Sequence, residues 1–351
     1  MKPEPFRIEP TFSPRIWGAR SLAPLFPEQT QLPEPIGEAW LTDVRCRIAN
    51  GPFAGKTLGE AWGQMPPQWR GSRLANTSDF PLLVKFLFPT DKLSIQVHPD
   101  DSYAAAHEAA AGGKGKTEMW HVISAQPGAS VLLGMKPETT KEDLLAALRL
   151  STVESLFNEI PVTTGDSIFV PARTGHGIGP GMILCEVQQY SDLTYRVYDY
   201  NRLDVHGNPR ELHIEKALAV MNFGTSLAGK TSPLPLPAPA GARELLAACR
   251  YFAAERWDFK TSIEILPQSA GKHFQLFVVL SGDGHIHWQG SPLSYHRGEC
   301  WFLPAAMPNF SFRPRQTTSL ICTYVPDISA LHTQLFGSGL SESQLSAALF
   351  G

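Results

Sequence analysis

Short apolar runs separated by turn residues dominate this 351-residue chain. The pattern is typical of β-strands, which we predict over residues 81–88, 93–99, 117–125, 129–135, 166–172 and 182–190. A second group of strands is predicted between residues 261 and 326, and Pro-Gly and Gly-Asp-Gly turn signals lie among the runs. Many short strands at regular spacing indicate a mainly β chain, built as a barrel or a sandwich.

Helical spacing of apolar residues interrupts the strands in a few places. The predicted helices cover residues 100–113, 140–150, 211–224 and 340–351. The second of these starts with a capping-box pattern between Thr140 and Asp143, and leucines follow at helical spacing. We therefore expect helices inserted in and after the first group of strands, and one more at the end of the chain.

A proline-rich segment, residues 227–242, divides the chain in two. Proline alternating with small residues favours extended backbone, so this segment predicts a linker between residues 1–226 and residues 243–351. Residues 164–177 and 297–310 share one pattern, in which a turn with glycine and an acidic residue leads into an aromatic strand that ends in Pro-Ala. We interpret this repeat as a duplicated β-barrel of the jelly-roll type.

Composition narrows the range of partners. A net charge of −3 gives no indication of a nucleic-acid or membrane-surface partner. The cysteines are scattered without a CxxC pair, which indicates free thiols in a reducing compartment; they are Cys46, Cys185, Cys249, Cys300 and Cys322. The first residues contain no apolar leader and no run approaches about 18 apolar residues, so we expect a cytoplasmic protein without membrane contact.

Four polar residues at strand positions form a candidate metal site. Gln96 and His98 are two residues apart on one predicted strand, so their side chains share a face. Glu118 opens the next strand and His176 follows the end of a later one, and inward faces of different strands meet in the lumen of a barrel. Two imidazoles, a carboxylate and a weak amide suit one Zn²⁺ with an open position, and other divalent transition metals fit the same ligands. A single histidine at a strand end is more often a hydrogen-bonded core or surface residue, so the prediction depends on all four side chains converging.

The second copy contains a similar pair, His285 and His287, again two residues apart. This pair follows the turn after its strand, unlike Gln96 and His98. Since no glutamate or third histidine stands in register there, we expect the second barrel to be metal-free.

Cationic and hydroxyl side chains accompany the candidate ligands. Ser94 and Lys116 share the strand faces of the predicted ligands, and Arg196 and Arg202 follow the strand that carries Glu186. Such groups suit an anionic ligand such as a phosphoryl group, whereas the chain has no Gly-rich nucleotide loop. The alternative is a solvated rim of ion pairs with acidic neighbours, namely Asp192, Asp199 and Asp204.

Several long segments together resemble one enzyme family. They are "IGEAWLTD" (36–43), "PLLVKFLFPTDKLSIQVHPDD" (81–101), "GKTEMWHVI" (115–123) and "GDSIFVPARTGHGIGPGMILCEVQQYSDLTYRVYDYNR" (165–202). The chain is similar to the type I mannose-6-phosphate isomerases in their short bacterial form, from about residue 15 to 222 and more faintly beyond. The resemblance implies two cupin barrels and a zinc-dependent enzyme that interconverts two hexose phosphates, mannose 6-phosphate and fructose 6-phosphate.

The resemblance also implies roles for single residues. The family's metal ligands fall on four positions: Gln96, His98, Glu118 and His176. Positions in the family's substrate pocket fall on Ser94, Lys116 and Glu186. Arg196 matches the catalytic arginine of the family, and Arg202 is a predicted phosphate contact. His121 stands where a tyrosine is commoner, and we assign it no role.

Aldose–ketose isomerisation moves a proton between two carbons through an enediol, which needs a base near the carbon and positive charge near the oxygens. A carboxylate can serve as base at neutral pH, so we expect Glu186 to be the base and Lys116 to be the second candidate. Arg196 is too basic to accept a proton and is expected to stabilise developing negative charge. Two alternatives stay open, a metal cupin that acts on another sugar phosphate and a non-catalytic sugar-binding cupin.

Overall fold

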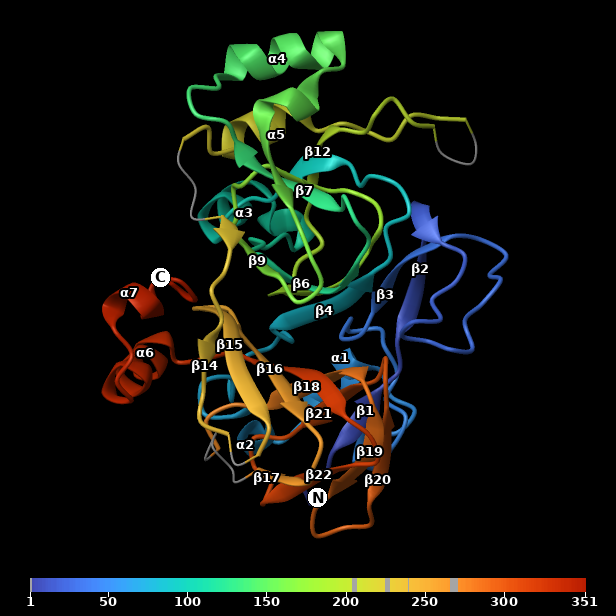
Figure 1. The fold of residues 1–351 in the computed structure, drawn as a ribbon, viewed down its shortest axis with the longest axis vertical. Coiled ribbons are helices and arrows are strands. Elements are labelled where there is room, and N and C mark those ends of the chain that lie inside the picture. The colour runs from blue at the N-terminus through green and yellow to red at the C-terminus, as the bar shows by residue number, and fades with distance from the viewer. Residues whose placement is uncertain (1, 204–206, 225–227, 239, 266–270) are drawn as a thin grey trace.

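Residues 2–351 are described by the computed structural model, except for residues 204–206, 225–227, 239 and 266–270. Within these described residues, four β-sheets form most of the regular structure, and short helices lie around them (Figure 1). The chain is therefore mainly β, as the sequence predicts. Two of the sheets are built from residues 11–230, and the other two come mainly from residues 234–350.

A seven-stranded sheet and a five-stranded sheet form the first half of the fold. The larger sheet has the order β13-β9-β6-β11-β4-β3-β2. Its strands are β2 (Thr11–Ala19), β3 (Ile36–Trp40), β4 (Leu82–Leu87), β6 (Glu118–Ala125), β9 (Ser167–Val170), β11 (Met182–Gln189) and β13 (Gly229–Lys230). The smaller sheet has the order β12-β5-β10-β7-β8. Its strands are β5 (Ile95–Val97), β7 (Ser130–Met135), β8 (Phe157–Pro161), β10 (His176–Ile178) and β12 (Tyr195–Tyr198).

An eight-stranded sheet and a four-stranded sheet form the second half. The larger has the order β1-β21-β18-β23-β16-β15-β14, with β24 paired to β15, and the smaller has the order β17-β22-β19-β20. The strands of the larger sheet are β1 (Phe6–Ile8), β14 (Leu234–Pro235), β15 (Ala242–Cys249), β16 (Ala253–Phe259), β18 (Gln275–Ser281), β21 (Cys300–Leu303), β23 (Thr318–Tyr324) and β24 (Leu349–Phe350). Those of the smaller are β17 (Ile263–Ile265), β19 (Asp283–His287), β20 (Leu293–His296) and β22 (Phe310–Pro314). Since β1 pairs with β21, the first strand of the chain belongs to the second pair of sheets.

The two large sheets correspond strand for strand. The order β9-β6-β11-β4-β3-β2 matches the order β21-β18-β23-β16-β15-β14. The register agrees as well, because Glu118 on β6 pairs with Val170 on β9, whereas Gln275 on β18 pairs with Leu303 on β21. Gln275 therefore stands where the first half has Glu118. This correspondence agrees with the predicted duplication.

Short helices connect the strands. They are α1 (Leu58–Gln64), α2 (Pro67–Arg70), α3 (Asp101–His107), α4 (Lys141–Leu150), α5 (Ile214–Val220), α6 (Ile328–Gly337) and α7 (Glu342–Leu345). Three 3₁₀ turns are η1 (Gly51–Phe53), η2 (Ala109–Ala111) and η3 (Val153–Leu156). The predicted helices over 100–113, 140–150 and 211–224 are confirmed as α3, α4 and α5, and α4 has the predicted capping box of Thr140 and Asp143. Among the described residues, none of the helices has the length and apolar character needed to cross a membrane.

The predicted helix over 340–351 is wrong for its second half. Only Glu342–Leu345 is helical, and Leu349–Phe350 forms β24 beside β15. The ring of Phe350 stacks on Phe169 of the other half at a centroid distance of 3.9 Å, and this long-range packing outweighs the local helical pattern. The sequence also gave no indication of α1, α2 or α6.

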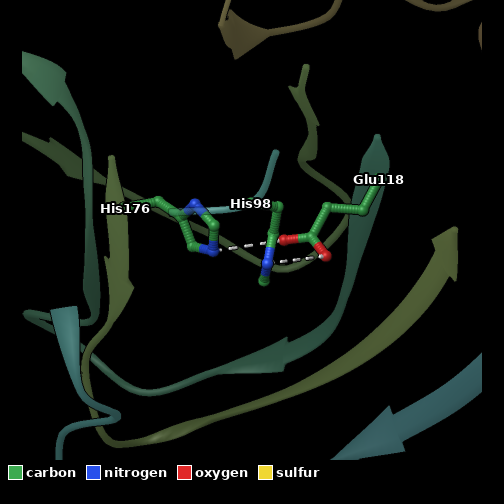
Figure 2. A group of neighbouring side chains, drawn as sticks. All are labelled: His98, Glu118 and His176. Atoms are coloured by element: carbon green, nitrogen blue, oxygen red, sulfur yellow. Dashed lines mark ion pairs between the residues drawn. The ribbon is translucent and has the colours of Figure 1, made fainter. Parts of the chain in front are cut away.

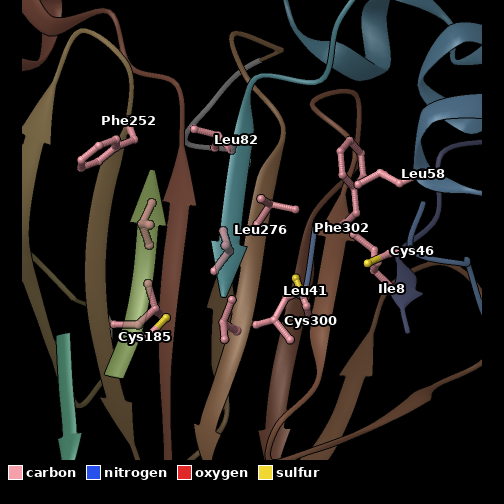
Figure 3. Packing of buried hydrophobic residues seen from close by; sticks show 14 of the residues in the cluster. Ile8, Leu41, Cys46, Leu58, Leu82, Cys185, Phe252, Leu276, Cys300 and Phe302 are labelled. Atoms are coloured by element: carbon pink, nitrogen blue, oxygen red, sulfur yellow. The ribbon is translucent and has the colours of Figure 1, made fainter. Parts of the chain in front are cut away.

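A large apolar cluster joins the two halves of the fold. It contains outward-facing residues of the seven-stranded sheet, such as Leu82 and Cys185, and residues of the eight-stranded sheet, such as Leu276 and Phe302 (Figure 3). The five cysteines, all within the described residues, are buried free thiols as predicted. The opposite face of the seven-stranded sheet is therefore the one left to face the five-stranded sheet and to carry polar groups.

The proline-rich segment is attached at both ends. Residues 227 and 239 of the segment 227–242 lie outside the described part of the chain. Between them, β13 pairs with β9 of the first half and β14 pairs with β15 of the second half. The segment thus crosses from one large sheet to the other as extended chain.

A buried ion pair in the second half provides a test of the packing. The Glu255 side chain is 1% exposed and accepts hydrogen bonds from Nε (2.7 Å) and Nη2 (3.0 Å) of Arg243, from Nε1 of Trp257 (2.8 Å) and from the hydroxyl of Tyr324 (2.9 Å). If this carboxylate is removed, the side chain of Arg243, which is only 14% exposed, loses this ion pair.

We expect Glu255→Ala to lower the free energy of unfolding by about 3 kcal/mol, because breaking a buried pair costs far more than breaking an exposed one. Urea unfolding followed by tryptophan fluorescence measures the change. The matched control is Glu244→Ala on β15, whose partially exposed pair with Arg256 is expected to contribute less than about 1 kcal/mol. Equal effects of the two variants would contradict the assigned role of Glu255.

Candidate metal centre and active site

Two histidines and a glutamate converge between the two sheets of the first half. His98 follows β5 and His176 begins β10, which is the neighbour of β5, whereas Glu118 begins β6 of the seven-stranded sheet. Figure 2 shows the two imidazoles directed at the carboxylate, with Nε2 of His98 3.7 Å from Oε2 and Nε2 of His176 3.4 Å from Oε1. The three side chains are at most 2% exposed, and their ligand atoms lie within 4.8 Å of one another. The structure thus brings three of the four predicted ligands together, and the group could hold a metal ion.

Gln96, the fourth predicted ligand, lies beside this group. It is paired with His176 in the antiparallel register of β5 and β10. Its amide nitrogen is 3.2 Å from Nε2 of His176. Since the two amide atoms of glutamine differ only by a rotation about the last side-chain bond, its oxygen can face the same point. Gln96 is therefore placed to be a ligand.

Backbone carbonyl groups fix the tautomers of both histidines. Nδ1 of His98 lies 2.9 Å from the carbonyl oxygen of Leu193, and Nδ1 of His176 lies 2.9 Å from that of Thr174. Each Nδ1–H donates to its carbonyl, which leaves the lone pair of Nε2 directed at Glu118. Burial lowers the pKa of both imidazoles, that of His176 to about 4, so both are neutral near pH 7. A neutral imidazole with an unprotonated Nε2 is the state that binds a metal; Nε2 of His98 has no hydrogen-bond partner among the described residues, and Nε2 of His176 faces the amide of Gln96.

Several polar atoms of this group lack hydrogen-bond partners, which also indicates a site for a cation. Within the described part of the chain, Nε2 of His98 and both carboxylate oxygens of Glu118 are buried without a hydrogen-bond partner. Nζ of Lys116 forms an ion pair with Oε2 of Glu118 at 2.9 Å. Each buried polar atom left unsatisfied costs about 1–3 kcal/mol, which a divalent cation between the three side chains would offset. We conclude that these residues fit a metal ion.

Glu186, the predicted base, is buried on β11 near this group. Its Oε2 accepts a hydrogen bond from Nε1 of Trp120 at 3.2 Å, and its Oε1 has no hydrogen-bond partner among the described residues. Burial and the charge of Glu118 raise the pKa of Glu186, against the opposing effect of Lys116 and Lys85. For Lys116, burial favours the neutral amine, but the carboxylates of Glu118 and Glu186 outweigh it and raise the pKa. The raised pKa makes Glu186 a stronger base than an ordinary glutamate, and its Oε1 accepts no hydrogen bond from the described residues.

The sequence analysis missed Lys85. This residue is 2% exposed on β4, and its Nζ lies 3.7 Å from Oε1 of Glu186 and 3.7 Å from Oδ1 of Asp192. The ammonium group also lies over the ring of Trp40, 4.4 Å from its centroid. The available signal was a single charge inside the apolar run of residues 81–88. A lysine is fully buried almost only when it is paired, so a buried lysine indicates a carboxylate beside it.

Arg196, Ser94 and His121, which the sequence analysis also discussed, lie in different surroundings. Arg196 is opposite Gln96 in the register of β12 and β5, and its Nη1 donates to the carbonyl oxygen of Glu211 at 2.9 Å. Ser94 is buried immediately before β5. His121 is on the other face of β6, where Nδ1 lies 2.9 Å from the hydroxyl of Ser167, and burial lowers its pKa to about 4.

Arg202 already has acidic partners. Its Nη2 lies 2.7 Å from Oδ1 of Asp199, and its Nη1 lies 3.1 Å from Oδ2 of Asp91. Nη1 also donates to the carbonyl oxygen of Lys92. Ion pairs with acidic neighbours were the alternative to phosphate binding predicted for Arg202. Asp204, another of the expected partners, lies outside the described residues.

Family models match both halves of the chain. Residues 5–126 match the type I phosphomannose isomerase catalytic domain, and residues 242–325 match the mannose-6-phosphate isomerase cupin domain. The fold and the site thus define a mainly β protein of the cupin class with a buried candidate metal centre.

Relatives of known name cover nearly the whole chain. The mannose-6-phosphate isomerases of Bacillus subtilis and Streptococcus mutans are each 33% identical over 88% of this chain, and the alignments cover 96% and 95% of those proteins. The crystal structure of the mannose 6-phosphate isomerase from Bacillus subtilis has a TM-score of 0.82 at 32% identity and covers 91% of this chain and 99% of its own. The chain belongs to the type I phosphomannose isomerase family. The family and the enzyme class predicted from the sequence, mannose-6-phosphate isomerase, are confirmed.

The fold extends to more distant structures. A variant of the phosphomannose isomerase from Salmonella typhimurium has a TM-score of 0.74 at 16% identity, and the match covers 92% of this chain and 99% of that one. At this level of identity the likeness concerns the fold alone. The arrangement of sheets is therefore shared well beyond the relatives that resemble the chain in sequence.

We expect His176→Ala and Glu118→Gln each to weaken metal binding by more than the roughly 10- to 100-fold that loss of an outer-shell partner costs, since both residues supply ligand atoms. Metal content after dialysis, measured by mass spectrometry of the element, tests this on the purified protein. The control is His107→Ala, an exposed histidine on α3. Undiminished metal content in both site variants would show that the ion binds elsewhere.

Proposed function

We propose that the chain interconverts mannose 6-phosphate and fructose 6-phosphate by moving a proton between C1 and C2 of the sugar at the site of His98, Glu118 and His176. The observation that carries the proposal is the convergence of these three buried side chains, of which His98 Nε2 and both oxygens of Glu118 lack a hydrogen-bond partner among the described residues, beside a second buried carboxylate, Glu186. The names of the relatives support the choice of substrate. The buried thiols support a reducing location such as the cytoplasm.

The proposed fold is a pair of jelly-roll barrels, each made of one large and one small sheet. We assign residues 1–226 to a catalytic barrel with helical insertions, residues 227–242 to a linker and residues 243–351 to a second barrel that binds no metal; β1 from the first segment and β14 from the linker pair into the large sheet of the second barrel. The shared strand order supports the pairing of the two barrels. Gln275 in place of Glu118 supports the assignment of metal binding to the first barrel alone.

Zn²⁺ is the proposed cofactor, one ion per chain, held by His98, Glu118 and His176 with Gln96 as the fourth ligand. Two neutral imidazoles, a carboxylate and an amide leave a position for substrate oxygen, and other divalent transition metals fit the same set. A divalent cation bound there supplies Lewis-acid polarisation of the carbonyl and hydroxyl oxygens of the sugar. Carbonyl groups of Leu193 and Thr174 keep the imidazoles in the required tautomers.

Glu186 is the proposed base. One of its oxygens accepts the Trp120 hydrogen bond, which orients the carboxylate, and the other, 3.7 Å from Nζ of Lys85, has no hydrogen-bond partner among the described residues and is the one that takes the proton from carbon. Its raised pKa brings its basicity closer to that of the reacting carbon acid than an ordinary carboxylate. Lys85 and Lys116 form ion pairs with Glu186 and Glu118, and together with Arg196 they provide positive charge near the enediol oxygens.

Ser94 and Lys116 are the proposed contacts of the sugar. Lys116 is buried next to Glu118 and brings its ammonium group to the place where the sugar oxygens are bound. Arg202 remains a predicted phosphate contact, and to make that contact its guanidinium must release Asp91 or Asp199.

A coupled assay for fructose 6-phosphate tests the proposed function. With mannose 6-phosphate as substrate, we expect turnover that is lost after treatment with a chelator and restored by Zn²⁺. Turnover that survives complete removal of metal would contradict the assigned centre. Absence of turnover with mannose 6-phosphate would contradict the substrate, and activity on another sugar phosphate would replace it.

We expect Glu186→Gln to lower kcat by about 10²- to 10⁴-fold with metal content unchanged, because it removes the base and keeps the shape. The wild-type rate should fall as the pH drops through the raised pKa of Glu186, so the acid limb of kcat/KM lies above pH 4.5, the ordinary value for a glutamate.

Lys116→Met tests the second candidate for the base, and Glu142→Gln, at an exposed position on α4, is the control. Wild-type turnover in both Glu186→Gln and Lys116→Met would refute the assignment of the base.

A further inference from the structure

One short turn of the second half contacts the first half through polar side chains. It comprises residues 250–252, between β15 and β16. Phe252 is fully buried in the apolar cluster that joins the two halves (Figure 3), and its ring centroid lies 6.4 Å from that of Phe169 on β9. Arg250 and Tyr251 both donate hydrogen bonds to a side chain of the first half. The turn is thus anchored by its third residue and presents its first two to the other half.

Asp101 accepts the hydrogen bonds of both residues. It is the first residue of α3, three positions after the candidate ligand His98. Its Oδ2 accepts from the hydroxyl of Tyr251 at 2.6 Å and from Nη2 of Arg250 at 3.0 Å. Burial raises the pKa of Asp101, but the hydrogen bonds that it accepts and the charge of Arg250 outweigh burial and lower the pKa. Asp101 is therefore an ionised carboxylate near pH 7.

Gln189 connects this carboxylate to the start of β6. Its Nε2 donates to Oδ1 of Asp101 at 3.0 Å, and its Oε1 accepts from the backbone N–H of Thr117 at 2.8 Å. The backbone N–H of Gln189 donates to the carbonyl oxygen of Thr117 at 3.1 Å. Thr117 is buried between Lys116 and Glu118, whose side chains form an ion pair at the candidate metal centre. Because Gln189 holds both backbone groups of Thr117, it fixes the direction of the two flanking side chains.

The segment before Thr117 lies directly against the start of α3. The backbone N–H of Lys116 donates to the carbonyl oxygen of Pro99 at 3.1 Å. At Gly115, a Cβ atom would lie 2.5 Å from the backbone nitrogen of Asp101 and 2.5 Å from its Oδ1. Such distances are far below van der Waals contact, so the approach depends on the absence of a side chain at position 115. A shift of Asp101 would therefore be passed on to the segment that leads into β6.

The end of this series of contacts in the second half is exposed. The side chain of Arg250 is 65% exposed and that of Asp101 is 42% exposed. Ion pairs at such positions contribute little to the free energy of unfolding, because water screens the charges. Thr117, at the other end, is buried. The contacts thus link an exposed turn to a buried strand start, and the exposed end can be removed without unfolding the chain.

Five residues form this continuous series of hydrogen bonds, which we name the Asp101 network: Arg250, Tyr251, Asp101, Gln189 and Thr117. We propose that the Asp101 network positions Lys116 and Glu118, so that the turn of the second half takes part in the geometry of the active site. Arg250 and Tyr251 are then positioning residues, which act through Asp101 and touch neither substrate nor metal. The inference rests on the proposed function and gives the second barrel a role in it.

The double variant Arg250→Met, Tyr251→Phe removes the donors of the second half and leaves the first half unchanged. In the metal-loaded protein we expect kcat for mannose 6-phosphate to fall by about 10-fold with a smaller change in KM, since misplacing a reacting group by about 1 Å can cost ~10²-fold in rate. The dissociation constant of Zn²⁺ should rise by about 3- to 10-fold, below the roughly 10- to 100-fold cost of losing a direct outer-shell partner.

Hydrogen exchange of the metal-free protein gives a readout that does not depend on catalysis. In the double variant, we expect the amide of Thr117 to exchange about 10-fold faster, because Gln189 then holds a carboxylate that has lost its other donors and local opening becomes easier. Mass spectrometry of peptides that span residues 114–119 measures the exchange. Peptides that cover β7 serve as the internal reference and should exchange at the wild-type rate.

A double-mutant cycle tests whether the Asp101 network acts as one unit. Asp101→Ala interrupts the network at its centre. If the network is continuous, adding Tyr251→Phe to Asp101→Ala changes kcat and Thr117 exchange no further, whereas independent residues would give the product of the two separate effects. Multiplicative effects in the cycle would overturn the proposal.

The control is Arg73→Met, which removes another exposed ion pair between the two halves, that of Arg73 Nη1 and Asp327 Oδ2 at 3.0 Å. It should leave kcat, the affinity for Zn²⁺ and Thr117 exchange at the wild-type values. If the double variant also keeps the wild-type values, or if Arg73→Met changes them equally, the Asp101 network is not a positioning device while the proposed function stands. If the wild type isomerises no hexose phosphate, the proposed function fails, and Zn²⁺ affinity and Thr117 exchange then decide on the network alone. Should the double variant fail to fold, Tyr251→Phe alone carries the test.

Discussion

The site depends on one constraint, the burial of the Glu118 carboxylate where two sheets meet. The side chain is 1% exposed, and the groups around it are two neutral imidazoles and one ammonium group. A carboxylate so far from water requires positive charge, and Lys116 provides only part of what its two oxygens can accept. Glu118 starts β6 in one sheet, whereas His176 starts β10 and His98 follows β5 in the other, so a cation bound at this point would also connect the two sheets. Metal binding would therefore be linked to the packing of the first half.

In the second half, a buried carboxylate is neutralised by an arginine side chain. By the register of the strands, Arg243 on β15 corresponds to Glu38 on β3, and Glu255 on β16 corresponds to Lys85 on β4. In the second half these two charges pair directly through two hydrogen bonds. In the first half the corresponding charges are directed at different partners, Glu38 at Arg15 and Lys85 at Glu186. Similar sheets thus support a closed ion pair in one half and an open polar site in the other.

Much of this could be predicted from the sequence, and the failures have physical causes. His98, Glu118 and His176 were identifiable because strand geometry fixes which side chains share a face, and because strands of one barrel point inward to a common centre. Lys85 was missed because its burial depends on Glu186 and Asp192, which are about 100 positions away along the chain. Residues 349–350 were predicted as helix because their pairing with β15 has no local signal. Of the two acidic partners of Arg202, Asp199 was expected from the sequence, whereas Asp91 lies 111 positions away along the chain and is identified only by the three-dimensional structure.

The central claim is that one divalent cation binds between His98, Glu118 and His176. Anomalous X-ray diffraction from crystals of the zinc-loaded protein, recorded on both sides of the zinc absorption edge, tests this most directly. We expect one strong anomalous peak within bonding distance of both Nε2 atoms and of a carboxylate oxygen of Glu118. A zinc-loaded crystal with no peak there, or with its strong peak at a surface pair such as His332 and Glu342, would show that this group is not the metal site.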